Sequence, residues 1–115
     1  FRKRESQALE FLKGSKGFII ATGGGAPVLK ENRHMMKKLG TTIFLDTDSK
    51  ILYKRMLKRG IPPIINKRNP KKSFEALYGQ RRTIYLKAAD MLIGISREPI
   101  KEIVKKIKAL LKKIE

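Results

Sequence analysis

The chain has 115 residues, enough for one modest domain, and it contains no cysteine, which excludes disulfide bonds and thiolate metal sites. Its 28 lysine and arginine residues against 10 acidic residues give a formal net charge of +18, so we expect anionic partners such as nucleotides, phosphorylated metabolites or nucleic acid. No apolar run has the length of a membrane span and no signal peptide is visible, and together with the lack of cysteine this favours a cytoplasmic protein.

The predicted elements alternate between helix and strand along the chain. Apolar residues at spacings of three and four indicate helices, and short runs rich in β-branched or aromatic residues indicate strands. The segment 60–72 holds three of the five prolines and fits no regular period, so it is predicted to be a loop. The predicted helices cover 1–13, 27–38, 49–59, 74–88 and 99–114, and the predicted strands cover 18–21, 41–46 and 91–95.

Local signals mark the ends of several of these elements. Gly40 is suited to end the second helix, and the side chains of Asp48 and Ser73 are suited to cap the third and fourth. Pro99 stands at the opening of the last helix, where proline is tolerated. The segment 18–21 is apolar at every position, which is typical of a strand covered on both faces.

Strands that alternate with helices predict right-handed βαβ units, and therefore an α/β fold with a parallel sheet. Three strands are few for such a sheet. The first residues already have the pattern of the middle of a helix, and the chain starts at Phe1 rather than at methionine. We therefore expect a single partial domain over 1–115, with the missing strands of its sheet preceding Phe1.

The stretch Phe18–Gly25 is the most informative part of the sequence, because an apolar run ends there in three consecutive glycines. Glycine permits positive φ and a close approach of the backbone to a ligand. A glycine-rich turn at the carboxyl end of a buried strand is a common place for α/β sheets to bind small anions. A plain tight turn fits the same residues, so this motif alone leaves both interpretations open.

Several short motifs follow one another in a specific order, although each is weak by itself. In chain order they are Phe1-Arg2 with Glu5, Thr22-Gly23-Gly24-Gly25, Arg55 before the proline-rich loop, Arg81 four residues before Tyr85, Ala89-Asp90, and Arg97 with Pro99. In this order and at this spacing, the chain resembles the shikimate kinase family over nearly all of its length.

The resemblance implies a three-layer α/β/α P-loop kinase fold with a parallel sheet, from which the N-terminal strand and the P-loop are absent. It also implies transfer of the γ-phosphoryl group of ATP to the 3-hydroxyl of shikimate, with Mg²⁺ as cofactor. The product would be 3-phosphoshikimate, in chorismate and aromatic amino-acid biosynthesis.

The resemblance assigns substrate-binding roles to two groups of residues. Arg2 and Arg81 match the two arginines that hold the shikimate carboxylate, and planar guanidinium groups suit a carboxylate because they pair with it bidentately. Gly23–Gly25 match the triple glycine whose backbone amides face the substrate, with Gly24 as the leading candidate. Taken singly, either arginine also fits an ordinary surface position, and Tyr85 is expected in the core.

The resemblance also assigns nucleotide-binding roles. Arg55 matches the arginine that packs on the adenine, where a flat cation suits a π face, while an ion pair with a nearby acidic residue is its alternative use. Arg97 and Pro99 match the turn beneath the adenine. The loop 60–72 matches the lid, which closes over the reacting phosphate.

The chain departs from the family pattern in two places. It contains no G-x-x-x-x-G-K-[ST] motif, so the P-loop and the acidic Mg²⁺ ligands are expected upstream of Phe1, with no metal ligands in this chain. The 115-residue chain alone is therefore expected to be inactive. The usual lid arginine is replaced by proline in Pro62-Pro63-Ile64-Ile65, and Arg68 is our candidate for the catalytic lid cation.

Two other functions stay open at this stage. Another small-molecule kinase of the same fold would share these motifs, although Arg2 and Arg81 together favour a carboxylate substrate. A basic nucleic-acid-binding domain is favoured by charge alone, but the aromatic residues occupy apolar-face positions rather than alternating with cations as a stacking surface requires. We expect shikimate and ATP as partners, no nucleic acid, no membrane, and a monomer.

Overall fold

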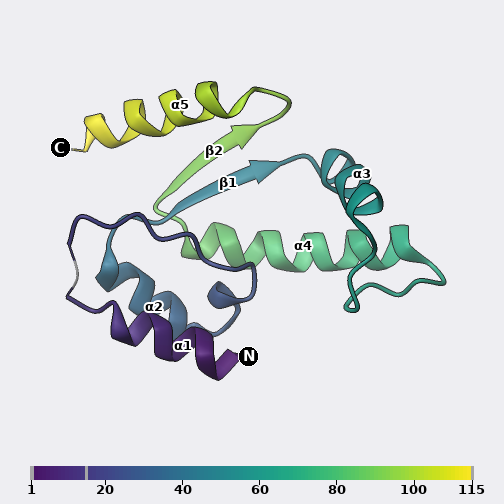
Figure 1. Ribbon diagram of the computed structural model, residues 1–115, viewed down its shortest axis with the longest axis horizontal. Helices are drawn as coiled ribbons and strands as arrows, with labels where there is room; N and C mark the ends of the chain where they lie inside the picture. The colour runs from purple at the N-terminus through teal and green to yellow at the C-terminus, as the bar shows by residue number, and fades with distance from the viewer. Residues whose placement is uncertain (1, 15, 115) are drawn as a thin grey trace. The chain divides into compact units, whose positions relative to one another are not determined.

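A computed structural model of the protein describes residues 2–14 and 16–114, with the side chain of Arg2 outside this description. Each of the two strands of the described chain lies between helices (Figure 1). In order, the elements are α1 (Arg2–Phe11), the 3₁₀ turn η1 (Ala26–Val28), α2 (Lys30–Leu39), β1 (Ile43–Thr47), α3 (Ser49–Arg59), α4 (Pro70–Ala88), β2 (Met91–Ile95) and α5 (Ile100–Lys113).

Strands β1 and β2 lie side by side in a two-stranded parallel sheet (Figure 1). Thr42, just before β1, ties the starts of the two strands together. Its carbonyl oxygen accepts hydrogen bonds from the N–H groups of Asp90 at 2.8 Å and Met91 at 3.2 Å. Its own N–H donates to Oδ2 of Asp90 at 2.8 Å. The predicted α/β class with a parallel sheet is confirmed.

Three helix ends that depend on local chemistry form where they are predicted. Oδ1 of Asp48 accepts a hydrogen bond from the N–H of Lys50 at 2.7 Å, so Asp48 caps the start of α3. Gly40 follows the last residue of α2, and its N–H donates to the carbonyl of Met36. Pro99 directly precedes α5. These features need only neighbours in the sequence, which is why the sequence predicts them correctly.

The strand predicted over Phe18–Ala21 is wrong for this structure. These residues form no strand, and their side chains are open to solvent, with exposed fractions of 67% for Phe18, 101% for Ile19 and 40% for Ile20. A strand exists only by exchanging backbone hydrogen bonds with a neighbouring strand. No described residue provides that exchange here, so the apolar run is extended but unpaired and uncovered.

Two helices begin differently from the prediction. α4 starts at Pro70 rather than at 74, so the last three residues of the predicted lid loop 60–72 are helical. Proline suits a first helical turn because it has no N–H to satisfy. The hydroxyl of Ser73 does not cap α4 and instead accepts a hydrogen bond from the N–H of Asn66 at 3.0 Å. The helix predicted from 27 is divided into η1 and α2 by extended backbone at Leu29.

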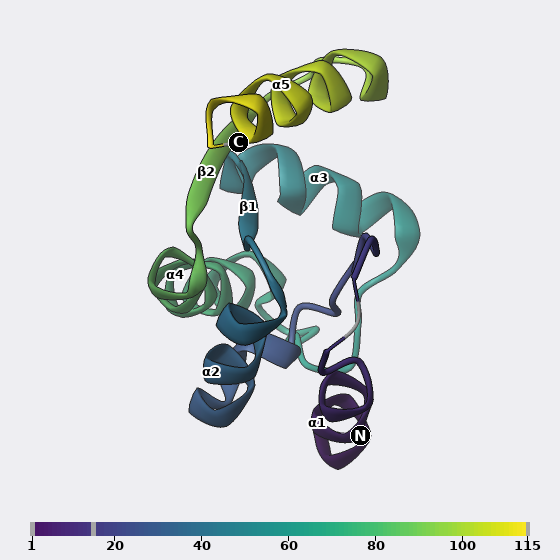
Figure 2. The same cartoon turned by 90° about the vertical axis from the view of Figure 1, so that its left-hand side faces the viewer.

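The described chain forms two compact units, each with its own buried residues. The first combines the residues up to Phe44 with Gln80–Met91, and the second combines Leu45–Gly79 with the residues from Leu92 onward. In the first unit α1, η1 and α2 pack together (Figure 2). Its buried apolar residues are Leu9, Ala26, Met36 and Ala88, and those of the second unit are Ile65 and Ile93.

Aromatic contacts connect α3 and α4 in the second unit. The ring centroid of Phe74 lies 5.5 Å from that of Tyr53 and 6.2 Å from that of Tyr78. The Tyr78 hydroxyl donates to the carbonyl of Thr47, at the end of β1, at 3.0 Å. Among the described residues, no helix combines the length and apolar character needed to cross a bilayer.

Candidate functional site

The triple glycine lies in the first unit, and its middle member is held by α4. The carbonyl oxygen of Gly24 accepts two hydrogen bonds, from Nη1 of Arg81 at 2.7 Å and from the hydroxyl of Tyr85 at 2.7 Å. Arg81 and Tyr85 are four residues apart, which places them on one face of the helix. The structure therefore brings together two residues that the sequence predicts for one site, Gly24 and Arg81.

The glycines are needed here for space and not for an unusual backbone conformation. None of Gly23–Gly25 has positive φ, which corrects the expectation raised by the sequence. A Cβ added at Gly24 would lie 2.9 Å from the Tyr85 hydroxyl oxygen and 3.8 Å from Nη1 of Arg81. At Gly23 the nearest atom to an added Cβ is Oε2 of Glu5, at an ordinary 3.5 Å. The steric restriction is therefore sharper at Gly24 than at Gly23.

Glu5 on α1 lies beside this turn. Its Oε1 is buried, and no described residue donates a hydrogen bond to it. A buried carboxylate oxygen is stable only when a donor or a cation is at hand. Arg2 precedes Glu5 on the same helix, but its side chain lies outside the described residues, so its predicted role in binding a carboxylate stays a prediction.

Tyr85 packs against an aromatic ring as well as contacting the turn. Its ring lies edge-to-face against Phe44, with the centroids 5.3 Å apart, but the residue is half-buried and is not one of the buried core residues expected from the sequence. Its hydroxyl reaches the Gly24 carbonyl, and that contact was not predicted. The sequence held a signal for it, because Tyr85 stands one helical turn after Arg81 on the same face.

Tyr85→Phe is expected to lower the free energy of unfolding by about 1 kcal/mol, because the hydrogen bond to Gly24 is lost while the ring packing is kept. Tyr53→Phe is the matched control, since no hydrogen bond of the Tyr53 hydroxyl is found among the described residues. Urea unfolding of both variants and the wild type gives the comparison. Equal losses in the two variants would contradict a specific role for the Tyr85 hydroxyl.

The residues predicted to bind the nucleotide lie in the second unit. Arg55 on α3, Arg68 in the loop before α4, and Arg97 after β2 all have exposed side chains. Within the described part of the chain, none of the three forms an ion pair with an acidic residue. The N–H of Arg68 donates to Oδ1 of Asn66 at 2.9 Å. No contact joins these arginines to one another, so their roles stay predictions.

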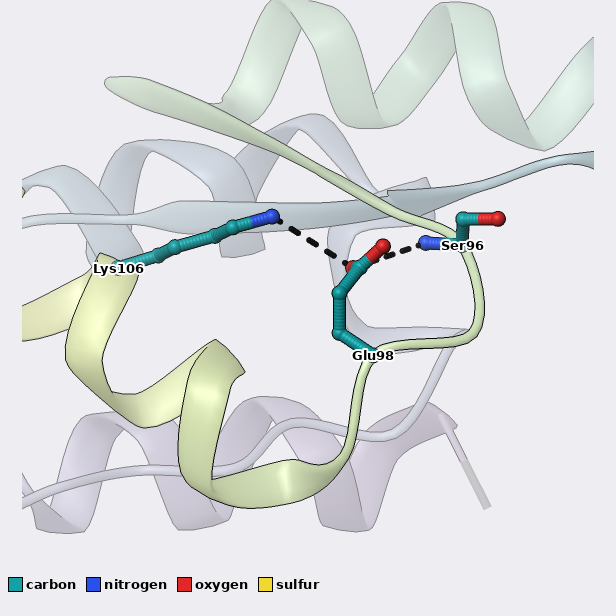
Figure 3. A network of polar contacts seen from close by, with 3 residues as sticks. All are labelled: Ser96, Glu98 and Lys106. Carbon is teal, nitrogen blue, oxygen red and sulfur yellow. Dashed lines mark hydrogen bonds and ion pairs between the residues drawn. The ribbon is translucent and has the colours of Figure 1, made fainter.

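The turn that contains Arg97 is closed by Glu98 (Figure 3). Oε2 of Glu98 accepts a hydrogen bond from the N–H of Ser96 at 3.1 Å and lies 3.5 Å from Nζ of Lys106 on α5. The hydrogen bond from Ser96 is the largest cause that lowers the pKa of the Glu98 carboxyl; desolvation, the next largest, opposes it, and the positive charge of Lys106 adds to the lowering. Arg97 and Pro99, which flank Glu98 in the sequence, therefore lie on a turn that the Glu98 side chain holds.

Glu98→Gln is expected to destabilise the protein near neutral pH and to lose its effect in acid. The folded pKa of Glu98 is below its ordinary value of 4.5, so the stabilisation by Glu98 is fully present above that value and disappears as the pH falls through the folded pKa. Unfolding midpoints of the variant and the wild type, taken at about pH 7 and about pH 3, measure this difference.

Glu102→Gln serves as the control, because Glu102 pairs with Lys105 at 3.5 Å in an exposed position and such pairs contribute little. A gap between Glu98→Gln and wild type that stays constant over this pH range would contradict the prediction.

Comparison with solved structures defines the class of the protein. The fold matches a structure described as shikimate kinase from Acinetobacter baumannii in complex with shikimate, with a TM-score of 0.88 and 27% sequence identity, over 100% of this chain and 64% of that one. The chain is thus an α/β protein of the P-loop kinase fold. The family model for shikimate kinase matches residues 1–112, and the chain belongs to the shikimate kinase family.

Curated relatives agree with this family. The chain is 34% identical over 103 residues to a shikimate kinase of Cupriavidus pinatubonensis, which covers 90% of this chain and 54% of the relative. It is 33% identical over 115 residues to a shikimate kinase of Bordetella avium, which covers 100% of this chain and again 54% of the relative. The chain therefore spans about half the length of these two relatives.

Proposed function

We propose that this chain supplies the acceptor-binding and nucleotide-binding part of a shikimate kinase, which transfers the γ-phosphoryl group of ATP to the 3-hydroxyl of shikimate. The observation that carries the proposal is the convergence of Arg81 and Tyr85 on the carbonyl of Gly24 at 2.7 Å each. It fixes a guanidinium group beside the triple glycine in a chain of this family. A relative solved in complex with shikimate supports the choice of substrate.

Arg81 has the chemistry to hold a carboxylate in this position. Its guanidinium carries several N–H donors in a rigid fork, and the Gly24 carbonyl accepts from Nη1. Donors therefore remain for a bidentate pair with a substrate carboxylate. Arg81 is half-buried, so an ion pair there is screened less by water and salt than an exposed one. A fixed carboxylate in turn fixes the ring and the hydroxyl that reacts.

In the proposed reaction, the oxygen of the 3-hydroxyl forms a bond to the γ-phosphorus of ATP, and the bond from that phosphorus to the β–γ bridging oxygen breaks. The hydroxyl gives up its proton, and ADP leaves. In such transfers the protein acts through positioning and electrostatic stabilisation. We assign the adenine to Arg55, Arg97 and Pro99, and we assign a cation near the γ-phosphate to Arg68.

The Mg²⁺ that the family implies has no evident ligands in this part of the protein. Within the described residues, no group of three or more histidine, aspartate or glutamate side chains is placed to hold a metal ion. No step is therefore assigned to a metal here, and its ligands, like the P-loop, are proposed to come from residues outside this chain. We also propose that the protein acts in the cytoplasm and is a monomer.

The test of substrate class is calorimetric titration of the protein expressed from its complete coding sequence. Shikimate is compared with its methyl ester, which keeps the ring and hydroxyls but lacks the charged carboxylate. Saturable binding of shikimate with binding of the ester weakened about 100-fold supports the proposal. Equal affinity for both, or no binding of either, contradicts it. Tight DNA binding that falls steeply with salt, with no effect of shikimate, would favour a nucleic-acid-binding function instead.

The test of the reaction is shikimate-dependent release of ADP from ATP. Turnover is expected from the complete coding sequence and not from the 115-residue chain, because this sequence contains no phosphate-binding G-x-x-x-x-G-K-[ST] motif. Robust turnover by the 115-residue chain would contradict the assignment of the P-loop to residues outside it.

A further inference from the structure

Every carbonyl oxygen from Gly23 to Val28 accepts a hydrogen bond from another group of the protein. The Gly23 carbonyl accepts from the N–H of Ala26 at 3.2 Å, and the Gly25 carbonyl accepts from the N–H of Val28 at 3.1 Å. The Gly24 carbonyl is held by α4. The remaining three carbonyls, those of η1, are held by side chains of α2.

Two adjacent residues of α2 make these last three bonds. Nδ2 of Asn32 donates to the Ala26 carbonyl at 2.9 Å. Nη1 of Arg33 donates to the carbonyls of Pro27 at 2.8 Å and Val28 at 3.0 Å. The turn that follows the triple glycine is thus held from α2, while the triple glycine itself is held from α4.

The Asn32 amide is buried, with 2% of the residue exposed. Its Oδ1 accepts a hydrogen bond from the Ser6 hydroxyl at 2.8 Å, so one side chain connects α1, α2 and η1. Burying an amide is unfavourable unless its hydrogen bonds are made, and an apolar side chain would fill the same space without that requirement. The amide also fixes the relative orientation of these elements, because its Nδ2 must reach the Ala26 carbonyl and its Oδ1 must reach the Ser6 hydroxyl.

We propose that Asn32 and Arg33 are positioning residues for the substrate-binding turn. They engage the carbonyl oxygens of Ala26–Val28 and so fix the place of Gly23–Gly25, and Asn32 also couples the turn to α1 through Ser6. Carbonyl oxygens of Ala26–Val28 that already accept hydrogen bonds from Asn32 and Arg33 do not compete with a substrate carboxylate for the N–H donors of Arg81. This inference rests on the proposed function, because it concerns the same site.

Asn32→Asp tests the proposal with almost no change in side-chain size. The carboxylate has no N–H to give to the Ala26 carbonyl, and it places an oxygen where a donor stood. In the protein expressed from its complete coding sequence, we expect the KM for shikimate to rise about 10-fold, with the KM for ATP and kcat changed less than about twofold.

Met36→Ala is the matched control, because Met36 is buried one turn further along α2 and its side chain is apolar. It should lower Tm without raising the KM for shikimate. Arg33→Met and Arg33→Lys form a second pair: methionine should reproduce the effect of Asn32→Asp, and lysine, which keeps a donor, should restore at least half of it. If Asn32→Asp does not fold, the two Arg33 variants still test the positioning role.

An unchanged KM for shikimate in both Asn32→Asp and Arg33→Met overturns the proposal, as does an equal rise in Met36→Ala. Amide hydrogen exchange at Ala26 and Val28, whose N–H groups bond within the turn, is read in the same variants. Exchange should be faster in Asn32→Asp and unchanged in Met36→Ala. If the wild-type protein shows no response to shikimate, the proposed function fails, while the exchange result still supports or refutes the positioning of the turn.

Discussion

Arg81→Lys is expected to raise the KM for shikimate about 100-fold, although the positive charge is kept. A lysine ammonium is a single point of charge, so it cannot form two parallel hydrogen bonds to a carboxylate while also donating to the Gly24 carbonyl, which Nη1 of Arg81 does at 2.7 Å. Because the ATP site uses other residues in the proposed function, the KM for ATP should change less than about threefold.

Steady-state kinetics with each substrate varied in turn measure this effect in the protein expressed from its complete coding sequence. Arg4→Lys is the control, because Arg4 is an exposed arginine of α1 outside the proposed site. Repeating the titration with the methyl ester of shikimate adds a second check. If Arg81 binds the carboxylate, the variant should distinguish the acid from the ester less strongly than the wild type does, and an undiminished preference for the acid would contradict that role.

Gly24→Ala is expected to cause the second large loss, of about 100-fold in kcat/KM for shikimate together with about 2 kcal/mol of stability. The added Cβ would lie 2.9 Å from the Tyr85 hydroxyl oxygen, closer than such atoms approach in proteins. Either the turn or the Tyr85 side chain must therefore shift, which strains the hydrogen bond from Tyr85 to the Gly24 carbonyl.

The double variant Gly24→Ala with Tyr85→Phe tests this cause directly. Phenylalanine removes the hydroxyl that the methyl group meets, so part of the lost stability should return and the two substitutions should not be additive. Gly79→Ala is the control for the residue change itself. Nothing lies within 4 Å of a Cβ added there in α4, so that variant should be more stable by about 1 kcal/mol. Strict additivity in the double variant would contradict the steric explanation.

The sequence predicts well those elements whose causes are local. β2 is observed at Met91–Ile95, as predicted from its apolar and β-branched run, and the Asp48 cap of α3 needs only the next two residues. The strand expected at Phe18–Ala21 fails for the opposite reason. Its composition is that of a strand, but pairing depends on a distant segment, and no described segment supplies it.

In the candidate site, the sequence predicts which residues take part but not how they are held. The resemblance to a family predicts Gly24 and Arg81 for one site, and the structure places them in contact, while their role in binding a substrate stays a prediction. The buried amide of Asn32 was not predicted. A signal existed, because Asn32 stands four residues before Met36 on the apolar face of α2, where a polar side chain has no reason to be unless it makes hydrogen bonds.

The exposed run Phe18–Ile20 has a consequence for how copies of this chain behave together. An extended apolar segment with unpaired backbone groups is a template for strand pairing between molecules, the first step toward cross-β aggregation. The net charge of +18 opposes that step by repulsion between copies. Because such repulsion is screened over about 10 Å at 0.1 M salt, we expect the colloidal stability of the 115-residue chain to decrease as ionic strength increases.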